Sequence, residues 1–256
     1  MRVTKLLVAL FLCCFCTGLS AQVADSAKPV LNFSGNASIT NNGISLVPSF
    51  SLNKPAALFN MSLGGKRLSF DPEFNFSLAG KPWYFLFWLR YKLVDQKRFK
   101  MTAGTHLGLN FKDAVLVTNG DSAKAMLTER YIVAELAPNY ALTNHTTVGV
   151  YFLHSRGLDP SSLKRGTFLT LNANFHDLRV AGPYLLKIVP QVFYLRQYKE
   201  EGYYATAAFT LSREHFPLSL SSVVNHSIQT EIEAGKGFVW NLSLNWSFRK
   251  QYLAKK

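Results

Sequence analysis

The chain has 256 residues, of which 48% are hydrophobic and 14% aromatic, and it carries a formal net charge of +13. Its mean hydropathy is only +0.05, and beyond residue 21 no apolar run reaches the roughly 18–20 residues of a transmembrane helix. This composition excludes a helical membrane protein, while the basic excess favours contact with anions or anionic lipid headgroups.

Residues 1–21 have the order of a secretory signal peptide. Arg2 and Lys5 precede an apolar run, and small residues at 17–21 offer a cleavage zone, so we expect processing at the end of that stretch. The mature chain would then have neither a disulfide nor a thiol ligand. A lipid-anchored cysteine is not favoured, because bulky residues precede the cysteines. All three cysteines lie inside the leader: Cys13, Cys14 and Cys16.

Residues 22–42 form an N-terminal segment in which Leu31–Ile39 alternates between apolar and polar residues. Alternation of this kind is typical of a β-strand. Three interpretations stay open for it: a strand that precedes the main sheet, a segment folded inside that sheet, or one of two further strands of a fourteen-stranded wall.

From residue 43 onward, strand candidates bounded by turn residues recur, with no helical periodicity of comparable strength. The longer connections, 112–124, 155–164 and 197–202, all fall at one end of an antiparallel sheet. An all-β domain of about twelve antiparallel strands (12–14) is therefore expected over 43–248. The predicted strands are 43–52, 56–63, 66–79, 82–94, 97–111, 125–138, 144–154, 165–176, 183–196, 202–213, 217–233 and 237–248.

Period-2 alternation assigns each side chain to one face of its strand. On 66–79, for example, Leu68 and Phe70 fall on one face, and Ser69 and Asp71 on the other. If the sheet closes into a barrel, the polar faces line its lumen. The charged lumen-lining candidates are Arg90, Lys92, Lys100, Lys187, Asp71, Glu73, Glu129, Glu135, Glu231 and Glu233.

These charges allow two arrangements of the lumen. Acids and bases at one level would pair and fill the bore, because isolated charges in a narrow interior are costly. Staggered charges would line a water path instead. Both open and plugged barrels of this size exist.

The strand from Phe238 to Phe248 alternates without exception, with Asn and Ser on its polar face from Asn241 onward. A soluble sandwich would hide the apolar face in a core, whereas a membrane-spanning strand turns it to lipid and crosses in about 9–11 residues. Its eleven residues, with aromatics at both ends, favour the membrane. The expected lipid-facing girdle is Phe238, Trp240, Trp246 and Phe248.

The leader, the lipid-facing alternation and the terminal Trp246–Phe248 resemble Gram-negative outer-membrane β-barrel proteins of the porin-like kind over essentially the whole mature chain. The resemblance implies an antiparallel transmembrane β-barrel in the bacterial outer membrane, with outer-membrane lipids and the barrel assembly machinery as partners. That machinery commonly reads a terminal aromatic residue. Here eight residues follow Phe248, so 249–256 is expected to form a basic periplasmic tail.

The sequence offers two candidates for a serine hydrolase site, His154–Ser155 and His226–Ser227. Some outer-membrane barrels are lipid hydrolases, and such a site needs His and Ser on one strand face so that the imidazole can take the hydroxyl proton. Adjacent residues point to opposite faces. We therefore predict no catalytic residues and no enzyme, with a lipid hydrolase as the lesser alternative.

Metal and cofactor sites are not predicted either. His106, His145 and His176 come from separated strands without paired ligand spacing. The stretch Gly64–Arg67 is better interpreted as a hairpin turn than as a phosphate-binding loop. Net charge alone does not predict nucleic-acid binding.

The leading hypothesis for function is porin-like passage of small polar solutes. The alternative is a closed barrel that serves as a structural or accessory subunit of an envelope complex, with an envelope protein as partner. Widely spaced lumenal bases would favour conduction, and close pairing with acids would favour a plug.

Overall fold

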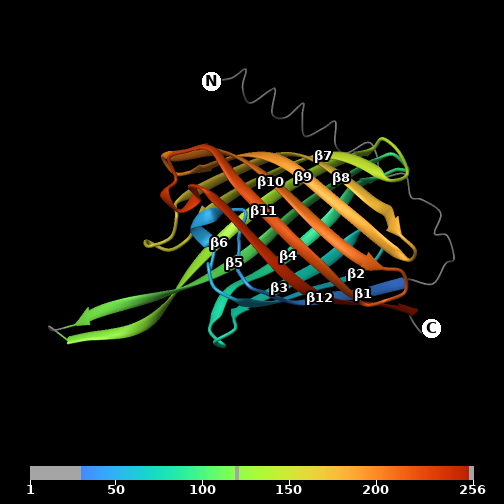
Figure 1. Ribbon diagram of the computed structural model, residues 1–256. Coiled ribbons are helices and arrows are strands. Elements are labelled where there is room, and N and C mark those ends of the chain that lie inside the picture. Colours follow the sequence, from blue (N-terminus) through green and yellow to red (C-terminus); the bar gives the residue numbers. More distant parts are fainter. Residues whose placement is uncertain (1–29, 119–120, 254–256) are drawn as a thin grey trace, which may run out of the picture.

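The computed structural model describes residues 30–118 and 121–253, and these form a closed barrel of twelve antiparallel strands (Figure 1). The prediction of an all-β, twelve-stranded antiparallel barrel is confirmed. The predicted leader lies outside the described residues. Within the described part of the chain, no helix has the length and apolar character needed to cross a membrane.

The strands follow one another round the barrel in chain order, and β1 closes it against β12. Two short 3-10 helices, η1 (Pro48–Phe50) and η2 (Glu233–Gly235), interrupt connections between strands. The strands are β1 (Val30–Thr40), β2 (Ala56–Gly64), β3 (Leu68–Ser77), β4 (Pro82–Asp95), β5 (Phe99–Thr118), β6 (Asp121–Ala141), β7 (Thr146–Gly157), β8 (Arg165–Ala181), β9 (Tyr184–Gln197), β10 (Glu200–Arg213), β11 (Leu218–Thr230) and β12 (Phe238–Leu253).

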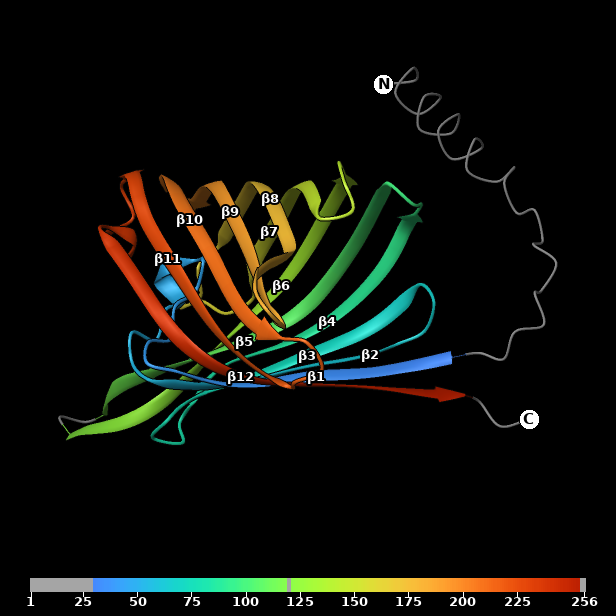
Figure 2. The same cartoon turned by 45° about the vertical axis from the view of Figure 1, so that its right-hand side comes forward.

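The two ends of the barrel differ in their connections. β1 begins and β12 ends at the same end, on the right in Figure 2, where Val30 is paired with Leu253 and only short turns join the strands. The longest connection, 41–55, lies at the opposite end. Outer-membrane barrels carry short turns on the periplasmic side and longer loops outside, so we name these the periplasmic and the external end.

The predicted strand 43–52 is wrong. Its backbone makes local bonds instead of a ladder, for example Phe50 N–H to the Val47 carbonyl at 2.9 Å, and Pro48 lacks an N–H for a central strand. The number of strands is still twelve, because β1 takes the place of the predicted strand 43–52 in the wall. The barrel therefore begins at Val30 and not at residue 43.

Other boundaries also differ from the prediction. Residues 112–124 were expected as a loop, but β5 and β6 continue through most of that range as a paired hairpin that projects beyond the external end (Figure 1). Lys81 in the β3–β4 turn forms an ion pair with Asp113 at 2.8 Å near its base. The expected tail 249–256 begins as strand, because β12 pairs with β1 up to Leu253.

The outer surface of the barrel is apolar all the way round. On β12, Trp240 is 52% exposed and Trp246 48%, whereas Asn241 between them is only 9% exposed. Such a continuous belt requires lipid around it. Every strand contributes at least one exposed apolar residue: Ile39, Phe59, Phe70, Leu89, Leu107, Ile132, Val150, Leu171, Val192, Phe209, Leu220 and Leu244.

Candidate functional site: the barrel lumen

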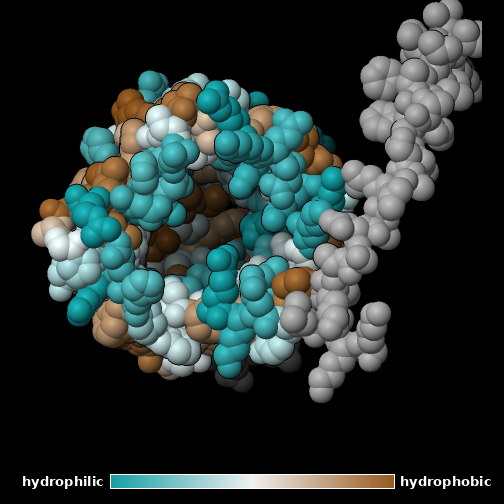
Figure 3. All heavy atoms as spheres, turned by 90° about the vertical axis from the view of Figure 1, so that its right-hand side faces the viewer, coloured by the Kyte–Doolittle hydropathy of each residue, from teal (hydrophilic) through white to brown (hydrophobic). Residues whose placement is uncertain are grey.

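The lumen forms a polar chamber of about 740 Å³ toward the periplasmic end. Figure 3 looks into this end and shows a hydrophilic rim around a hollow, with hydrophobic residues deeper inside. Inward-facing positions of strands from both sides of the β1–β12 seam supply the wall. The polar lining consists of Ser34, Asn36, Asn60, Ser62, Asp71, Glu73, Arg90, Ser212, Ser219, Ser247 and Arg249.

Arg90 on β4 lies between two carboxylates from different strands. Its Nη1 is 3.1 Å from Asp71 Oδ2 on β3, and its Nε is 2.7 Å from Glu135 Oε1 on β6. The Tyr151 hydroxyl donates to the other Glu135 oxygen at 2.6 Å. Gly104 allows this approach, because a Cβ there would lie 2.6 Å from Glu135 Oε1. Arg90 thus forms an ion pair with a carboxylate on each side and is not a free base in the lumen.

The other three candidate bases lie away from this cluster. Lys92 is 52% exposed and 4.0 Å from Asp95 on its own strand. Lys100 borders a separate basic pocket of about 270 Å³ at the periplasmic rim, together with Lys97 and Arg98. Lys187 is exposed on β9. The structure therefore joins Arg90 to its acids but does not gather the four bases.

The acidic candidates separate into three groups. Asp71 and Glu73 line the chamber, and Glu135 belongs to the Arg90 cluster. Glu129 is buried on β6 and accepts a hydrogen bond from the Tyr131 hydroxyl at 2.9 Å, with Lys112 Nζ also at 2.9 Å. The assignment of Glu231 and Glu233 to the lumen is wrong.

The reason is that β11 ends earlier than its alternation indicated. It stops at Thr230, and Glu231 and Glu233 follow in the external connection. The Glu233 side chain is 86% exposed and pairs with Lys236 at 2.5 Å. The Glu233 carboxylate also raises the pKa of Lys236, so this pair is a surface feature of the rim.

At the external end, residues 41–55 lie within the mouth of the barrel (Figure 2), and we call them the plug segment. The plug segment carries η1. Trp83 Nε1 donates to the Phe50 carbonyl at 2.7 Å, and Gln197 Nε2 donates to Ser49 Oγ at 2.7 Å. The Phe50 and Tyr131 rings pack edge to face with centroids 5.2 Å apart. The plug segment is thus tied to opposite parts of the wall.

Below the plug segment the inner face of the wall is apolar, which sequence reasoning largely missed. One cluster gathers around Trp88, Tyr131 and Val133, and the other around Phe193 and Leu195. From the alternation alone, we expected the inner faces of the strands to be polar. A signal was present, since strand stretches such as 83–89 and 192–195 are apolar on both faces.

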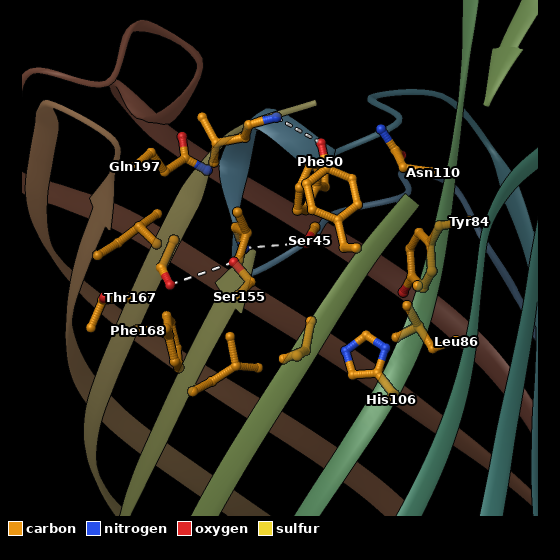
Figure 4. A pocket seen from close by; sticks show the side chains of 18 of the residues that line it. Ser45, Phe50, Tyr84, Leu86, His106, Asn110, Ser155, Thr167, Phe168 and Gln197 are labelled. Atoms are coloured by element: carbon orange, nitrogen blue, oxygen red, sulfur yellow. Dashed lines mark hydrogen bonds between the residues drawn. The ribbon is translucent and has the colours of Figure 1, made fainter. Parts of the chain in front are cut away.

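A smaller cavity of about 170 Å³ lies between these clusters and the plug segment. Figure 4 shows Phe50 of the plug segment on one side of it and His106, Leu86 and Phe168 from the wall on the others. Most of the lining is apolar or aromatic, and His106 is a buried polar member.

The His–Ser pairs are divided by the barrel wall. His154 is exposed on the outer side, where its Nδ1 lies 3.1 Å from Thr167 Oγ1, while Ser155 lines the inner cavity. Ser227 Oγ accepts from the Gly237 N–H at 2.9 Å, and the His226 side chain is exposed. Neither pair has the geometry for proton transfer within the pair.

The three histidines considered as ligands also separate. His106 lies inside the barrel, whereas His145 and His176 meet at the periplasmic turns with ring centroids 6.0 Å apart. Asp177, which sequence reasoning did not consider, joins them, and the three offer ligand atoms within 4.8 Å of one another. The His176 Nδ1–Asp177 Oδ2 distance is 2.7 Å.

No family model and no curated protein matches the chain. Among solved structures, the KdgM porin in complex with disordered oligogalacturonate is similar, with a TM-score of 0.53 and 11% identity over 85% of this chain and 99% of that one. The KdgM porin alone gives 0.53 and 12% over 84% and 99%. This chain has a porin-like outer-membrane barrel fold. Together with the apolar belt, the fold places the protein in the bacterial outer membrane, as predicted.

Proposed function

We propose that the barrel passes small polar solutes along a porin-type route, and that the plug segment controls this route at its external end. The observation that carries the proposal is the contrast between wall and plug segment. The wall is a continuous ladder, whereas the external end is occupied by a connection between two strands. Such a connection can move while every wall hydrogen bond stays in place.

The contacts of the plug segment support this role. Trp83 and Gln197 each donate a single neutral hydrogen bond to it, and bonds of this kind contribute about 0.5–1.5 kcal/mol each. The polar chamber at the other end is already large enough for small solutes. Displacement of 41–55 is then the step that opens the external end.

A closed barrel serving as a structural or accessory subunit is the second candidate. The Asp71–Arg90–Glu135 pairing supports it, because paired charges fill a bore instead of lining a water path. The β5–β6 hairpin, which projects beyond the barrel, offers an element for contact with an envelope partner.

Single-channel conductance of the refolded full chain in a planar bilayer tests the proposal. A Trp83→Phe/Gln197→Ala double variant removes the Trp83 and Gln197 hydrogen bonds to the plug segment, and we expect more frequent or larger conductance steps than in the wild type. Trp246→Phe on the lipid face is the matched control. A salt gradient, applied also to a Lys92/Lys100/Lys187→Gln variant, tests whether ion preference depends on those bases.

Two outcomes contradict the proposal. If neither the wild type nor the double variant conducts, although heat-modifiable migration shows that both are folded, the structural role is favoured. Equal conductance of the wild type and the double variant would mean that the plug segment does not control passage.

A further inference from the structure

We infer that the cavity beneath the plug segment binds a small aromatic molecule with one hydrogen-bonding group, of the chemical class of a phenol. The inference concerns the 170 Å³ cavity and not the polar chamber. It stands whether or not the barrel conducts.

The size and lining of the cavity select the apolar part of the ligand. Leu86, Val133 and Leu153 supply aliphatic walls, and Trp88 and Phe168 supply aromatic ones. An apolar protein cavity of about 150 Å³ stays dry and binds benzene. A sugar or another polyhydroxylated solute would lose its hydrogen bonds to water without replacement here. The cavity therefore fits a single substituted ring.

His106 selects the polar part of the ligand. Its side chain is buried, with 7% exposure, and Nδ1 has no hydrogen-bond partner among the described residues. The Trp88 ring covers the imidazole with centroids 3.9 Å apart. A buried polar atom without a partner is unfavourable, and a ligand hydroxyl could serve as donor or acceptor to either neutral tautomer.

Gly108 shows that this nitrogen borders the cavity. A Cβ built at Gly108 would lie 3.4 Å from His106 Nδ1 and 3.3 Å from Leu86 Cδ2. Gly108 and Leu86 both line the cavity, so Nδ1 lies directly behind the cavity wall at a position that carries no side chain, and a small shift of the imidazole or of Leu86 brings it into contact with a ligand hydroxyl. Figure 4 shows His106 and Leu86 side by side at this wall.

The test compares two ligands that differ in one hydroxyl. The full chain in detergent micelles is titrated with 4-fluorophenol and with fluorobenzene, and fluorine NMR follows saturable binding. We expect both to bind and the phenol to bind about tenfold more tightly, as one added hydrogen bond allows. His106→Leu should remove that preference, so that the two ligands bind about equally, whereas His106→Gln should retain part of it.

Matched controls separate the site from the micelle. His154→Leu makes the same change on the outer face and should leave both affinities as in the wild type. Leu153→Phe narrows the cavity and should weaken both ligands. Folding of each variant is checked by heat-modifiable migration, and His106→Phe replaces His106→Leu if the latter does not fold.

Three results would overturn the inference. Binding of neither ligand to the folded wild type would mean that the cavity takes no small aromatic molecule. Equal uptake by the wild type and Leu153→Phe would assign the signal to the micelle. An unchanged phenol preference in His106→Leu would remove His106 from the site.

Discussion

The periplasmic and external halves of the lumen share one wall but carry opposite inner faces. Around the periplasmic chamber the inward positions hold residues such as Ser62 and Asp71, whereas beneath the plug segment they hold Val133 and Phe193. The outer face is apolar in both halves. Alternation therefore decides what faces lipid, while the inner residues decide whether a region holds water or a packed segment.

The boundary between the halves lies on β4. Arg90 and Trp88 are two residues apart on the same inner face, and the Arg90 guanidinium carbon is 4.1 Å from the centre of the Trp88 ring. The guanidinium thus covers the aromatic cluster and at the same time forms the charged floor of the chamber. Its stacking and its ion pairs join the two halves.

The largest expected effect comes from the outer face, which both halves share. Leu244→Arg would place a charge toward lipid on β12, at a cost of about 2–4 kcal/mol at the bilayer midplane, and should prevent assembly. Ser247→Arg places the same residue on the inner face at the chamber and should assemble. Heat-modifiable migration distinguishes the two variants. A normal yield of folded Leu244→Arg barrel would contradict the face assignment.

Removing the residue at the boundary should have the next largest effect. Arg90→Ala leaves Glu135, whose side chain is 3% exposed, without its ion-pair partner. Breaking a buried pair costs about 3–5 kcal/mol, and we expect the lower end because Arg90 is 29% exposed. Urea unfolding in detergent measures the change in free energy. An Arg90→Met/Glu135→Gln variant should recover much of the loss.

A failure of that recovery would contradict the pairing as the cause of the loss. If the double variant is as unstable as Arg90→Ala, the contribution of Arg90 comes from its stacking on Trp88 and not from the carboxylates.

Weakening a hydrogen bond that holds the plug segment should change amide exchange in the external half of the barrel only. Ser49→Ala removes the acceptor of the Gln197 bond, and loss of a hydrogen bond of about 1 kcal/mol corresponds to about fivefold faster amide exchange in the plug segment. Exchange in the wall around the chamber should not change. Ser45→Ala is a less suitable control, because Ser45 bonds within the plug segment itself. Ser219→Ala, in the chamber, is the better one.

The sequence predicted the wall well because the constraint from lipid is local. A stretch such as Phe238–Phe248 shows both faces and its length without reference to any other strand. The plug segment could not be predicted in the same way. Choosing between 31–39 and 43–52 as the wall strand requires knowing which of them pairs with β12, a contact between distant parts of the chain.

The charge cluster was predictable in its members but not in its pairing. Alternation put Asp71, Arg90 and Glu135 on inner faces, yet their distances depend on the registers of β3, β4, β5 and β6 together. The assignment of Glu231 and Glu233 to the lumen was wrong for a local reason. Alternating residues past Thr230 do not show where a strand ends.

The smallest expected effect is a pH dependence at the external rim. Asp159 in the β7–β8 loop accepts hydrogen bonds from Arg130, including one from its backbone N–H at 2.6 Å, and these hold the pKa of the Asp159 carboxyl below its usual range. A lowered carboxyl pKa means that the contact stabilises the loop above the ordinary carboxyl pKa and is lost as pH falls through the lowered value. Limited proteolysis within 158–164 should therefore increase in acid. Asp159→Asn should make the loop equally sensitive at all pH values, and unchanged acid sensitivity in that variant would assign the effect to another group.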